Sequence, residues 1–344
     1  MRAIYIERSG GYDVLKVREV AAPAPKAGEV AITVKAAGIN FADILARQGI
    51  YPDAPKFPAV VGYEVAGTVT AVGAGADAKL LGKEVLALTD FGGYAEVACV
   101  DAAYVWEKPA KLSFEQAAAI PLNYITAWGL LVAMGGLSRG ETVLIHNAGG
   151  GVGLAALEIA KHRGAIAIGT ASARKHEFLR ARGCDECVDY TAANWPAEVL
   201  RLTGGKGVEL AIDPIGGANW KKTYSVLRKT GRMGMFGISS AATGGLRAKL
   251  DLVKLALRTP IFHPLKIIPG NRGVFGINIH SMYEESGKFG AWMGEVLRGV
   301  EEGWVRPHVD KVFRFDEAGA AHAHIESRGN IGKVLLVPQA RAAS

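Results

Sequence analysis

Small residues between an apolar run and a helical segment form the clearest candidate binding site in the sequence. Residues 142–146 are apolar and partly β-branched, and Ala148, Gly150 and Gly153 follow with the spacing A-x-G-x-x-G. A strand, tight turn and helix of this kind let backbone N–H groups approach a pyrophosphate, and the helix N-terminus adds partial positive charge. Alanine stands at the first glycine position, and such a turn also occurs as an ordinary connection. A second apolar run at 164–170, one helical segment later, favours a dinucleotide-binding unit.

The residues after that second run predict which nicotinamide cofactor binds. An acid there would hydrogen-bond the ribose 2′-OH of NADH and repel the 2′-phosphate of NADPH. The segment 170–176 contains no acid and carries Ser172, Arg174 and Lys175 instead. A hydroxyl with two cations suits a phosphate dianion, so the sequence predicts NADPH. The alternative is a basic helix start that faces solvent.

Composition limits the class of protein. A chain of 344 residues suits two domains, and 49% apolar residues with 44 glycines indicate a compact, turn-rich α/β protein. The net charge of +7 suits acidic ligands, but the basic residues form no long run, so no nucleic-acid partner is expected. Three cysteines make no disulfide framework, and neither a secretory signal nor an apolar run of roughly 18 residues is visible. A cytoplasmic protein without a transmembrane segment is expected.

The order of predicted elements divides the chain. Residues 1–121 are mostly short β runs, followed by helices at a Ser113–Gln116 capping box and at about 126–134. Residues 140–280 alternate strand and helix, which predicts a doubly wound parallel sheet of the Rossmann type with helices on both faces. Its expected strands are 142–146, 165–170, 186–189, 208–213, 231–237 and 273–279. A helix at 284–302 and two short strands, at 312–315 and 333–337, complete the chain.

Seven short motifs are similar to those of the medium-chain dehydrogenases/reductases and occur in the same order. They are Gly38-Ile39-Asn40-Phe41-Ala42-Asp43, Gly49-Ile50-Tyr51-Pro52, Gly62-Tyr63-Glu64, Tyr94-Ala95-Glu96, Ala148–Gly153, Asp213-Pro214-Ile215-Gly216-Gly217 and Gly231-Arg232. Asn40–Asp43 and Gly169–Ser172 resemble the zinc-free quinone oxidoreductase branch, and within it the vesicle amine transport type. The resemblance implies a β-rich, GroES-like catalytic domain from 1–122 and 300–344 and a Rossmann nucleotide-binding domain from 123–299.

Zinc is not expected. Three positions that hold cysteine, histidine and cysteine in zinc alcohol dehydrogenases hold Asn40, Tyr63 and Leu122 here, whereas a catalytic zinc needs three good ligands. The pair Cys184 and Cys187 has metal or redox spacing but lacks a second pair, so two ordinary thiols are favoured.

The resemblance implies that Asn40 and Tyr51 contact substrate. An asparagine amide can donate a hydrogen bond to a quinone or enone oxygen as negative charge develops there. A phenol could do the same or deliver a proton. The alternatives are that the Asn40 amide satisfies local backbone and that Tyr51 packs beside Pro52.

The resemblance also implies cofactor contacts at small, hydroxyl, aromatic and basic residues. Beyond those of the glycine turn and the Ser172 segment, they are Asn123, Thr126, Gly151, Val152, Tyr190, Phe236, Gly237, Phe275, Gly276 and Lys333. Each also suits an ordinary loop or core position, and Lys333 could instead face water. His146 ends the first strand of the unit and is expected to be buried and hydrogen-bonded rather than catalytic.

Together these features predict an NADPH-dependent reductase of quinones or other α,β-unsaturated carbonyl compounds. Without zinc the site cannot strongly polarise an isolated ketone, so a conjugated acceptor is the chemically sensible substrate. The alternative is a structural or membrane-associated NADPH-binding protein, inactive or weakly active, that retains the reductase fold.

Two further segments suggest partners. The basic, amphipathic stretch 246–258 could lie on an anionic membrane, but a crossover helix packed on the sheet is favoured. The apolar strand at 273–279 would end the sheet, and an open edge of this kind favours a homodimer that pairs two such strands.

Overall fold

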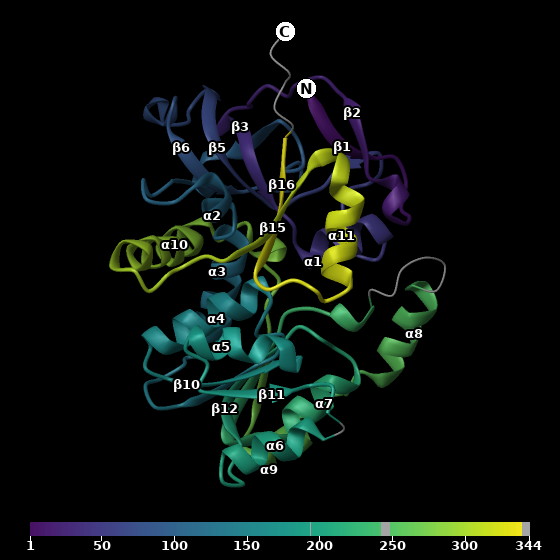
Figure 1. The fold of residues 1–344 in the computed structure, drawn as a ribbon, viewed down its shortest axis with the longest axis vertical. Helices are drawn as coiled ribbons and strands as arrows, with labels where there is room; N and C mark the ends of the chain where they lie inside the picture. The colour runs from purple at the N-terminus through teal and green to yellow at the C-terminus, as the bar shows by residue number, and fades with distance from the viewer. Residues whose placement is uncertain (193, 242–247, 339–344) are drawn as a thin grey trace. The chain divides into compact units, whose positions relative to one another are not determined.

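The computed structural model describes residues 1–192, 194–241 and 248–338 (Figure 1). They form two compact units, which we call the first and second units. The first contains Met1–Asn123, His280–Glu302 and Pro307–Ser344, and the second contains Tyr124–Ile279 and Gly303–Arg306. The predicted domain boundaries stay a prediction.

Two sheets build the first unit. A seven-stranded sheet has the order β15-β16-β3-β5-β6-β8, with β7 paired to β3, and a three-stranded sheet has the order β2-β1-β4. The strands are β1 (Arg2–Ile6), β2 (Lys16–Glu19), β3 (Glu29–Gly38), β4 (Ala59–Val60), β5 (Glu64–Val72), β6 (Glu84–Leu88), β7 (Val97–Asp101), β8 (Val105–Glu107), β15 (Val309–Arg314) and β16 (Lys333–Val337). The predicted β-rich N-terminal part is confirmed, and both C-terminal strands join its larger sheet.

Helices α1 (Phe41–Gln48), α2 (Phe114–Ala118), α10 (Ser286–Glu302) and α11 (Ala318–Glu326) complete the first unit. The predicted capping box begins α2: the Gln116 N–H donates to Ser113 Oγ over 3.2 Å, and the Ser113 N–H donates to the Gln116 side chain over 3.1 Å. Helix α3 (Pro121–Trp128) runs from the first unit into the second. The expected start near residue 126 is therefore wrong, because the fixed φ of Pro121 suits the first helical turn.

The second unit contains the predicted six-stranded parallel sheet. Its order is β11-β10-β9-β12-β13-β14, with all neighbouring pairs parallel. The strands are β9 (Thr142–Ile145), β10 (Ile166–Ala171), β11 (Glu186–Asp189), β12 (Val208–Asp213), β13 (Leu227–Met235) and β14 (Gly273–Gly276). Figure 1 shows α4 (Gly151–His162) and α5 (His176–Ala181) on one side of this sheet, and α6 (Trp195–Leu202) and α7 (Ala218–Ser225) on the other. Burial on both faces explains why these strands read as apolar runs.

Helices α8 (Ala248–Arg258) and α9 (Pro264–Gly270) connect β13 to β14. Val253 is 58% exposed and Leu257 is 83% exposed, so this face of α8 is not covered by the sheet. The expectation that another face of α8 packs on the sheet stays a prediction. The helical spacing of apolar residues predicts an apolar face but does not say what covers it. Among the described residues, no helix has the length and apolar character needed to cross a membrane.

We expect the core of the second unit to depend on Leu144, which is fully buried in a cluster that includes Ile168, Val188 and Trp195. Leu144→Ala should lower the free energy of unfolding by about 2–5 kcal/mol, because it removes buried methyl groups and leaves a cavity. Ile166→Ala, at a half-exposed position of the neighbouring strand, is the matched control and should cost less than about 1 kcal/mol. Urea unfolding measures both changes, and equal losses would contradict this description of the core.

Candidate functional site

The small-residue turn lies between β9 and α4, as predicted. Gly153 is required by close backbone approach, because a Cβ there would lie 2.3 Å from the carbonyl oxygen of Asn147. The alanine at the first glycine position also has an explanation. Ala148 is buried, and its methyl group packs against Gly169 of β10. A Cβ on Gly169 would lie 2.9 Å from the Ala148 Cβ, so the absence of a side chain at Gly169 leaves room for this methyl group. The first N–H groups of a helix have no partner within the helix, so the start of α4 is a suitable place for a phosphate.

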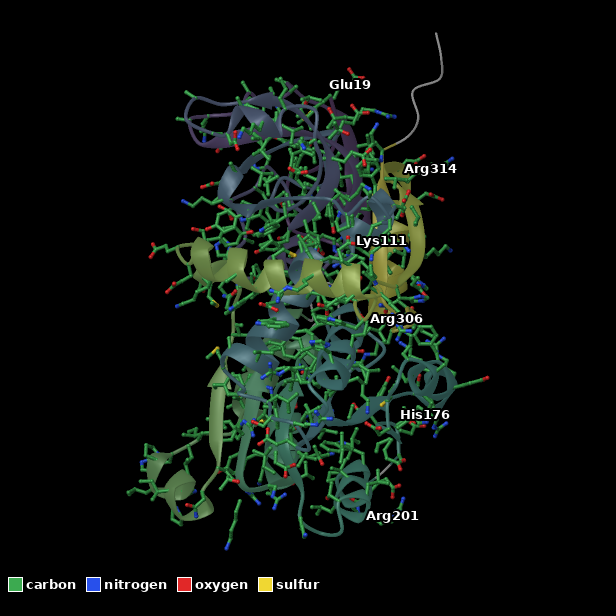
Figure 2. The ribbon with its side chains drawn as sticks, turned by 90° about the vertical axis from the view of Figure 1, so that its left-hand side faces the viewer. Glu19, Lys111, His176, Arg201, Arg306 and Arg314 are labelled. Carbon is green, nitrogen blue, oxygen red and sulfur yellow. The ribbon has the colours of Figure 1, made fainter. Side chains whose placement is uncertain are left out.

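The Ser172 segment follows β10 and has one buried and one exposed cation. Lys175 is 5% exposed and lies against the glycine turn, since a Cβ on Gly149 would lie 2.9 Å from Lys175 Cδ. Arg174 is exposed and Ser172 is half-buried. The ring of His176, labelled in Figure 2, contacts the Ala171 carbonyl oxygen at 3.0 Å. The alternative of a basic helix start that only faces solvent is thus wrong for Lys175.

His146 is buried and hydrogen-bonded, as expected. Its Nδ1 lies 3.0 Å from Thr170 Oγ1 and its Nε2 lies 3.0 Å from Thr223 Oγ1, which donates to Asp213 over 2.6 Å. Burial lowers the pKa of His146 below its usual 6.5, although Asp213 opposes the shift. The network joins the ends of β9, β10 and β12 beneath the turn, so His146 serves the scaffold.

The other candidate cofactor residues of the second unit lie mostly at or beyond strand ends. Phe236 and Gly237 follow β13, and Tyr190 follows β11. Phe275 packs its ring over Gly234 of β13, where a Cβ would lie 2.8 Å from the ring. Gly151, Val152 and Thr126 are helical, in α4 and α3, and Gly276 ends β14.

In the first unit, three polar side chains meet at the end of β3. Lys333 Nζ donates to Asn40 Oδ1 over 2.5 Å, and Asn40 Nδ2 donates to Glu64 Oε1 over 2.9 Å. Lys333 also forms an ion pair with Glu64, whose second carboxylate oxygen accepts from the Leu122 N–H over 2.8 Å. All three side chains are buried, with exposed fractions of 8% for Asn40, 3% for Lys333 and zero for Glu64. We call this group the Asn40 triangle.

The Asn40 triangle fixes which way the amide points. Its oxygen faces the ammonium of Lys333 and its nitrogen faces the carboxylate of Glu64, so a flipped amide would lose both contacts. One of the two Nδ2–H donors is used by Glu64, which leaves the other for a ligand oxygen. Gly38 makes room for the pair, because a Cβ there would lie 2.5 Å from Glu64 and 2.7 Å from Lys333.

Sequence reasoning missed the role of Glu64. An acid at the start of an apolar strand indicates a buried partner, but sequence spacing does not identify that partner. The alternative that Lys333 faces water is wrong, and a contact between Lys333 and a cofactor stays a prediction. Asn123 is buried on α3 and donates to the Ala119 carbonyl over 3.0 Å.

A second buried acid, Asp43, holds the backbone beside Asn40. Its carboxyl group accepts from the Asn40 N–H over 2.8 Å, from the Tyr94 hydroxyl over 3.0 Å and from the Gly62 N–H over 3.1 Å. Burial raises the pKa of Asp43 to about 7, although the hydrogen bonds from Asn40 and Tyr94 and the charge of Lys333 oppose the shift. Asp43 therefore titrates near neutral pH.

Tyr51, the second candidate substrate contact, lies beside Tyr63. The rings of Tyr51 and Tyr63 meet edge to face at 6.2 Å, and Phe91 lies 4.5 Å from Tyr63. Burial raises the pKa of Tyr51 above 10, so its phenol stays protonated at neutral pH and can donate a hydrogen bond. Among the described residues, no group of three or more histidine, cysteine or acidic side chains is arranged to hold a metal ion.

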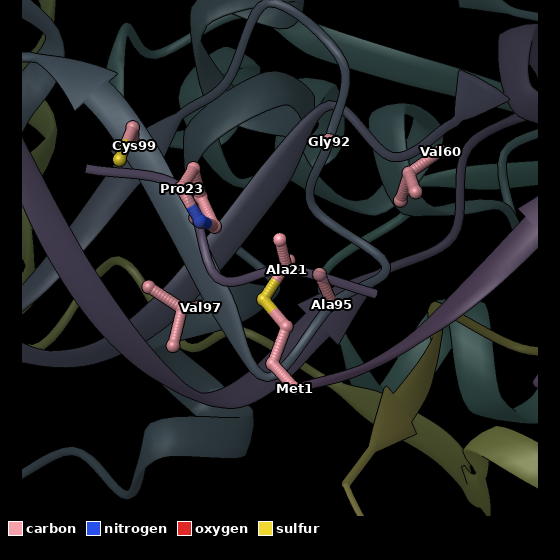
Figure 3. Close-up of a pocket in the computed structure, with 9 residues that line it drawn as sticks. Met1, Ala21, Pro23, Val60, Gly92, Ala95, Val97 and Cys99 are labelled. Atoms are coloured by element: carbon pink, nitrogen blue, oxygen red, sulfur yellow. The ribbon is translucent and has the colours of Figure 1, made fainter. Parts of the chain in front are cut away.

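A separate pocket of about 280 Å³ lies in the first unit (Figure 3). Its lining is almost wholly apolar and consists of Met1, Ala21, Pro23, Val60, Gly92, Ala95, Val97, Ala98 and Cys99. None of the candidate catalytic or cofactor-binding residues lines it.

Comparisons with known proteins agree with this arrangement. Residues 26–110 match the alcohol dehydrogenase GroES-like domain, which confirms the predicted GroES-like part, and residues 182–336 match the zinc-binding dehydrogenase family. The human synaptic vesicle membrane protein VAT-1 homolog is 34% identical over 341 residues, which cover 98% of this chain and 86% of that protein. Human quinone oxidoreductase is 31% identical over 341 residues, 98% of each chain. The Escherichia coli quinone oxidoreductase complexed with NADPH superposes with a TM-score of 0.87 at 29% identity, covering 98% of this chain and all of that one.

We expect the Asp43 carboxyl to make stability fall as pH rises. It is protonated in the folded protein up to a pKa of about 7, whereas the unfolded chain ionises it near 3.8. Between these two pH values Asp43 is protonated in the folded state and ionised in the unfolded state. The contribution of Asp43 to the free energy of unfolding should therefore fall by about 1.4 kcal/mol per pH unit as the pH rises through this range.

Urea unfolding at a series of pH values tests this, with Asp43→Asn as the reference. The reference removes the effect of other groups, such as His322, whose pKa burial lowers to about 3. As the pH rises, the free energy of unfolding of wild type minus that of Asp43→Asn should fall up to about pH 7 and then become constant. A difference that rises with pH would mean that the folded protein holds Asp43 ionised.

Proposed function

Because this chain belongs to the medium-chain dehydrogenase/reductase superfamily and is an oxidoreductase of the quinone oxidoreductase type, we propose that it reduces quinones or other α,β-unsaturated carbonyl compounds with NADPH. The observation that carries the proposal is the Asn40 triangle, which presents a fixed amide donor at the position the family uses for substrate. The glycine turn supports the cofactor half.

The second unit has suitable residues to hold NADPH. The turn Ala148–Gly153, including Gly151 and Val152, would bind the pyrophosphate through backbone N–H groups. Ser172, Arg174, Lys175 and Tyr190 would bind the 2′-phosphate, and no acid in this segment opposes it. The E. coli quinone oxidoreductase was solved with NADPH, which supports the same choice here. Among the remaining candidates, Thr126, Phe236, Gly237, Phe275 and Gly276 of the second unit would line the nicotinamide side. Asn123 and Lys333 belong to the first unit, and we assign Lys333 to positioning Asn40 instead.

Bound NADPH would supply a hydride to the conjugated system, and the first unit would stabilise the charge that develops on the carbonyl oxygen. The second Nδ2–H of Asn40 donates to that oxygen. Lys333 draws electron density toward Asn40 Oδ1, which strengthens the N–H donor, and the preset orientation needs no rearrangement during the reaction. Tyr51, protonated at neutral pH, is a second donor and a candidate source of the proton.

The direct test of this function is turnover with simple quinones and enones, followed by NADPH absorbance. Asn40→Ala should lower kcat/KM by about 100-fold, because one preorganised donor is lost, while the NADPH dissociation constant stays near wild type. Asn330→Ala, at a half-buried amide of the first unit that donates to the Gly332 carbonyl and is assigned to neither substrate nor cofactor, is the matched control. Wild-type protein that binds NADPH but turns over none of these acceptors would favour the structural, non-catalytic alternative.

Cofactor selectivity gives a separate prediction. NADPH should bind more tightly than NADH. Arg174→Ala should reduce the difference in binding free energy between the two cofactors by about 1.5–3 kcal/mol, which is the contribution of one charge-assisted hydrogen bond. Lys206→Ala, at another exposed cation of the second unit, should leave the gap unchanged. Fluorescence titration with both cofactors measures this, and equal wild-type affinities would refute the assignment of the 2′-phosphate site.

We also propose a homodimer that pairs two β14 strands, since β14 ends the sheet and β13 is its only strand partner among the described residues. The Ile277 N–H donates to Met235 of β13 over 3.0 Å, and alternation along the strand turns the Gly276 N–H toward the open edge. Ile277 is buried within one chain, so a substitution there would disturb the fold. Gly276→Pro removes an outward donor and should convert the dimer to a monomer by light scattering, with the circular dichroism unchanged. A monomeric wild type would disprove the pairing.

A further inference from the structure

Two thiols, those of Cys184 and Cys187, lie beside the same glycine of the parallel sheet. Cys187 of β11 is the register partner of Gly169 of β10, so its side chain lies on the face to which a Gly169 side chain would point. A Cβ on Gly169 would lie 2.9 Å from Cys184 Sγ, which places the second thiol on that face as well. The two thiols form a hydrogen bond in the space that Gly169 leaves open.

The two thiols differ in their surroundings. Cys184 is 5% exposed, and its sulfur lies 3.1 Å from the carbonyl oxygen of Glu186. Cys187 is half-buried, and its sulfur lies 3.7 Å from the carbonyl oxygen of His176. The hydrogen bond from Cys184 lowers the pKa of Cys187, and the positive charge of Arg180 acts in the same direction, although burial opposes the shift. Cys187 is therefore the more accessible and more readily ionised thiol, and Cys184 is the protected one.

We propose that Cys184 and Cys187 form a redox-active dithiol, which hydrogen peroxide converts to a disulfide. The Cys187 thiolate attacks one peroxide oxygen and breaks the O–O bond, so Cys187 becomes a sulfenic acid, and the released hydroxide takes up the proton that Cys187 lost. The Cys184 sulfur then attacks the Cys187 sulfur, and the S–O bond breaks. The Cys184 proton leaves with that hydroxide as a second water, and a small thiol such as glutathione reverses the oxidation.

Oxidation also affects the predicted 2′-phosphate site through His176, and this part of the proposal rests on the proposed function. In the reduced protein the Cys187 thiol donates to the His176 carbonyl, and the His176 ring contacts the Ala171 carbonyl. Because His176 directly follows the segment 172–175, these two contacts join that segment to β11 and β10. A disulfide has no S–H to donate, so oxidation removes the contact with β11 and holds the segment less firmly.

Mass spectrometry of the folded full chain tests the disulfide. Hydrogen peroxide should remove the mass of two hydrogen atoms, and dithiothreitol should restore it. Cys99→Ser, at the half-buried cysteine of the first unit, is the matched control and should show the same loss. Cys184→Ser should stop at a sulfenic acid on Cys187 that dimedone traps, and Cys187→Ser should give neither product. Because Cys184 is buried, Cys184→Ala is used beside the serine variant and should give the same trapped product.

Fluorescence titration of the reduced and oxidised proteins tests the effect on the cofactor. Oxidation should weaken NADPH binding about two- to tenfold, as expected for the loss of one hydrogen bond. NADH binding should stay unchanged, because NADH has no 2′-phosphate. Cys187→Ala, which has no S–H to donate, should bind NADPH as weakly as the oxidised wild type with or without peroxide. Cys99→Ser should respond to peroxide as wild type does.

Folded wild type that keeps its mass in peroxide would overturn the dithiol, and so would a disulfide between two chains that Cys99→Ser abolishes. Equal NADPH affinities of the reduced and oxidised proteins would overturn the effect on the cofactor. The mass measurement needs neither cofactor nor turnover, so its result is separate from that of the proposed function. Reduced wild type that binds no NADPH would refute the proposed function together with the effect on the cofactor, while the mass measurement would still decide the dithiol.

Discussion

The first unit depends on a buried ion pair between Lys333 and Glu64 that is joined by one amide. Removing two charges from water costs several kcal/mol for each, and only close mutual contact with further hydrogen bonds offsets that cost. Here Asn40 and the Leu122 N–H supply the further hydrogen bonds that offset the cost. Gly38, which has no side chain, leaves the space that lets the two charges approach each other. Strands β3, β5 and β16, far apart in the sequence, must therefore meet at one point in one register.

That constraint explains how a site without the zinc-ligand residues can still stabilise a developing negative charge. Zinc alcohol dehydrogenases place a cation directly at the oxygen, whereas this chain has Asn40, Tyr63 and Leu122 at those positions. Its positive charge lies one hydrogen bond further away, on Lys333, and acts through the Asn40 amide. Such an arrangement suits an acceptor that is already activated by conjugation.

The sequence predicted the scaffold better than the site. The six strands of the parallel sheet were readable because burial on both faces leaves apolar runs, and the α2 capping box because its contacts are local. Glu64 and Asp43 could not be assigned partners, since their contacts join residues that are distant in sequence. The contact between Ala148 and Gly169 likewise forms only because β9 and β10 are neighbours in the folded sheet. The apolar residues on the exposed face of α8 have the helical spacing that a buried face would also have, so the sequence could not tell the two apart.

A double-mutant cycle on Lys333 and Asn40 tests the central claim most directly, with kcat/KM for a quinone and the NADPH dissociation constant as readouts. If Lys333 acts through Asn40, then Lys333→Met and Asn40→Ala will each lower kcat/KM, and the double variant will be little worse than Asn40→Ala alone. NADPH affinity will stay near wild type throughout. Losses that multiply in the double variant, together with weaker NADPH binding in Lys333→Met, would contradict the account and make Lys333 a cofactor ligand.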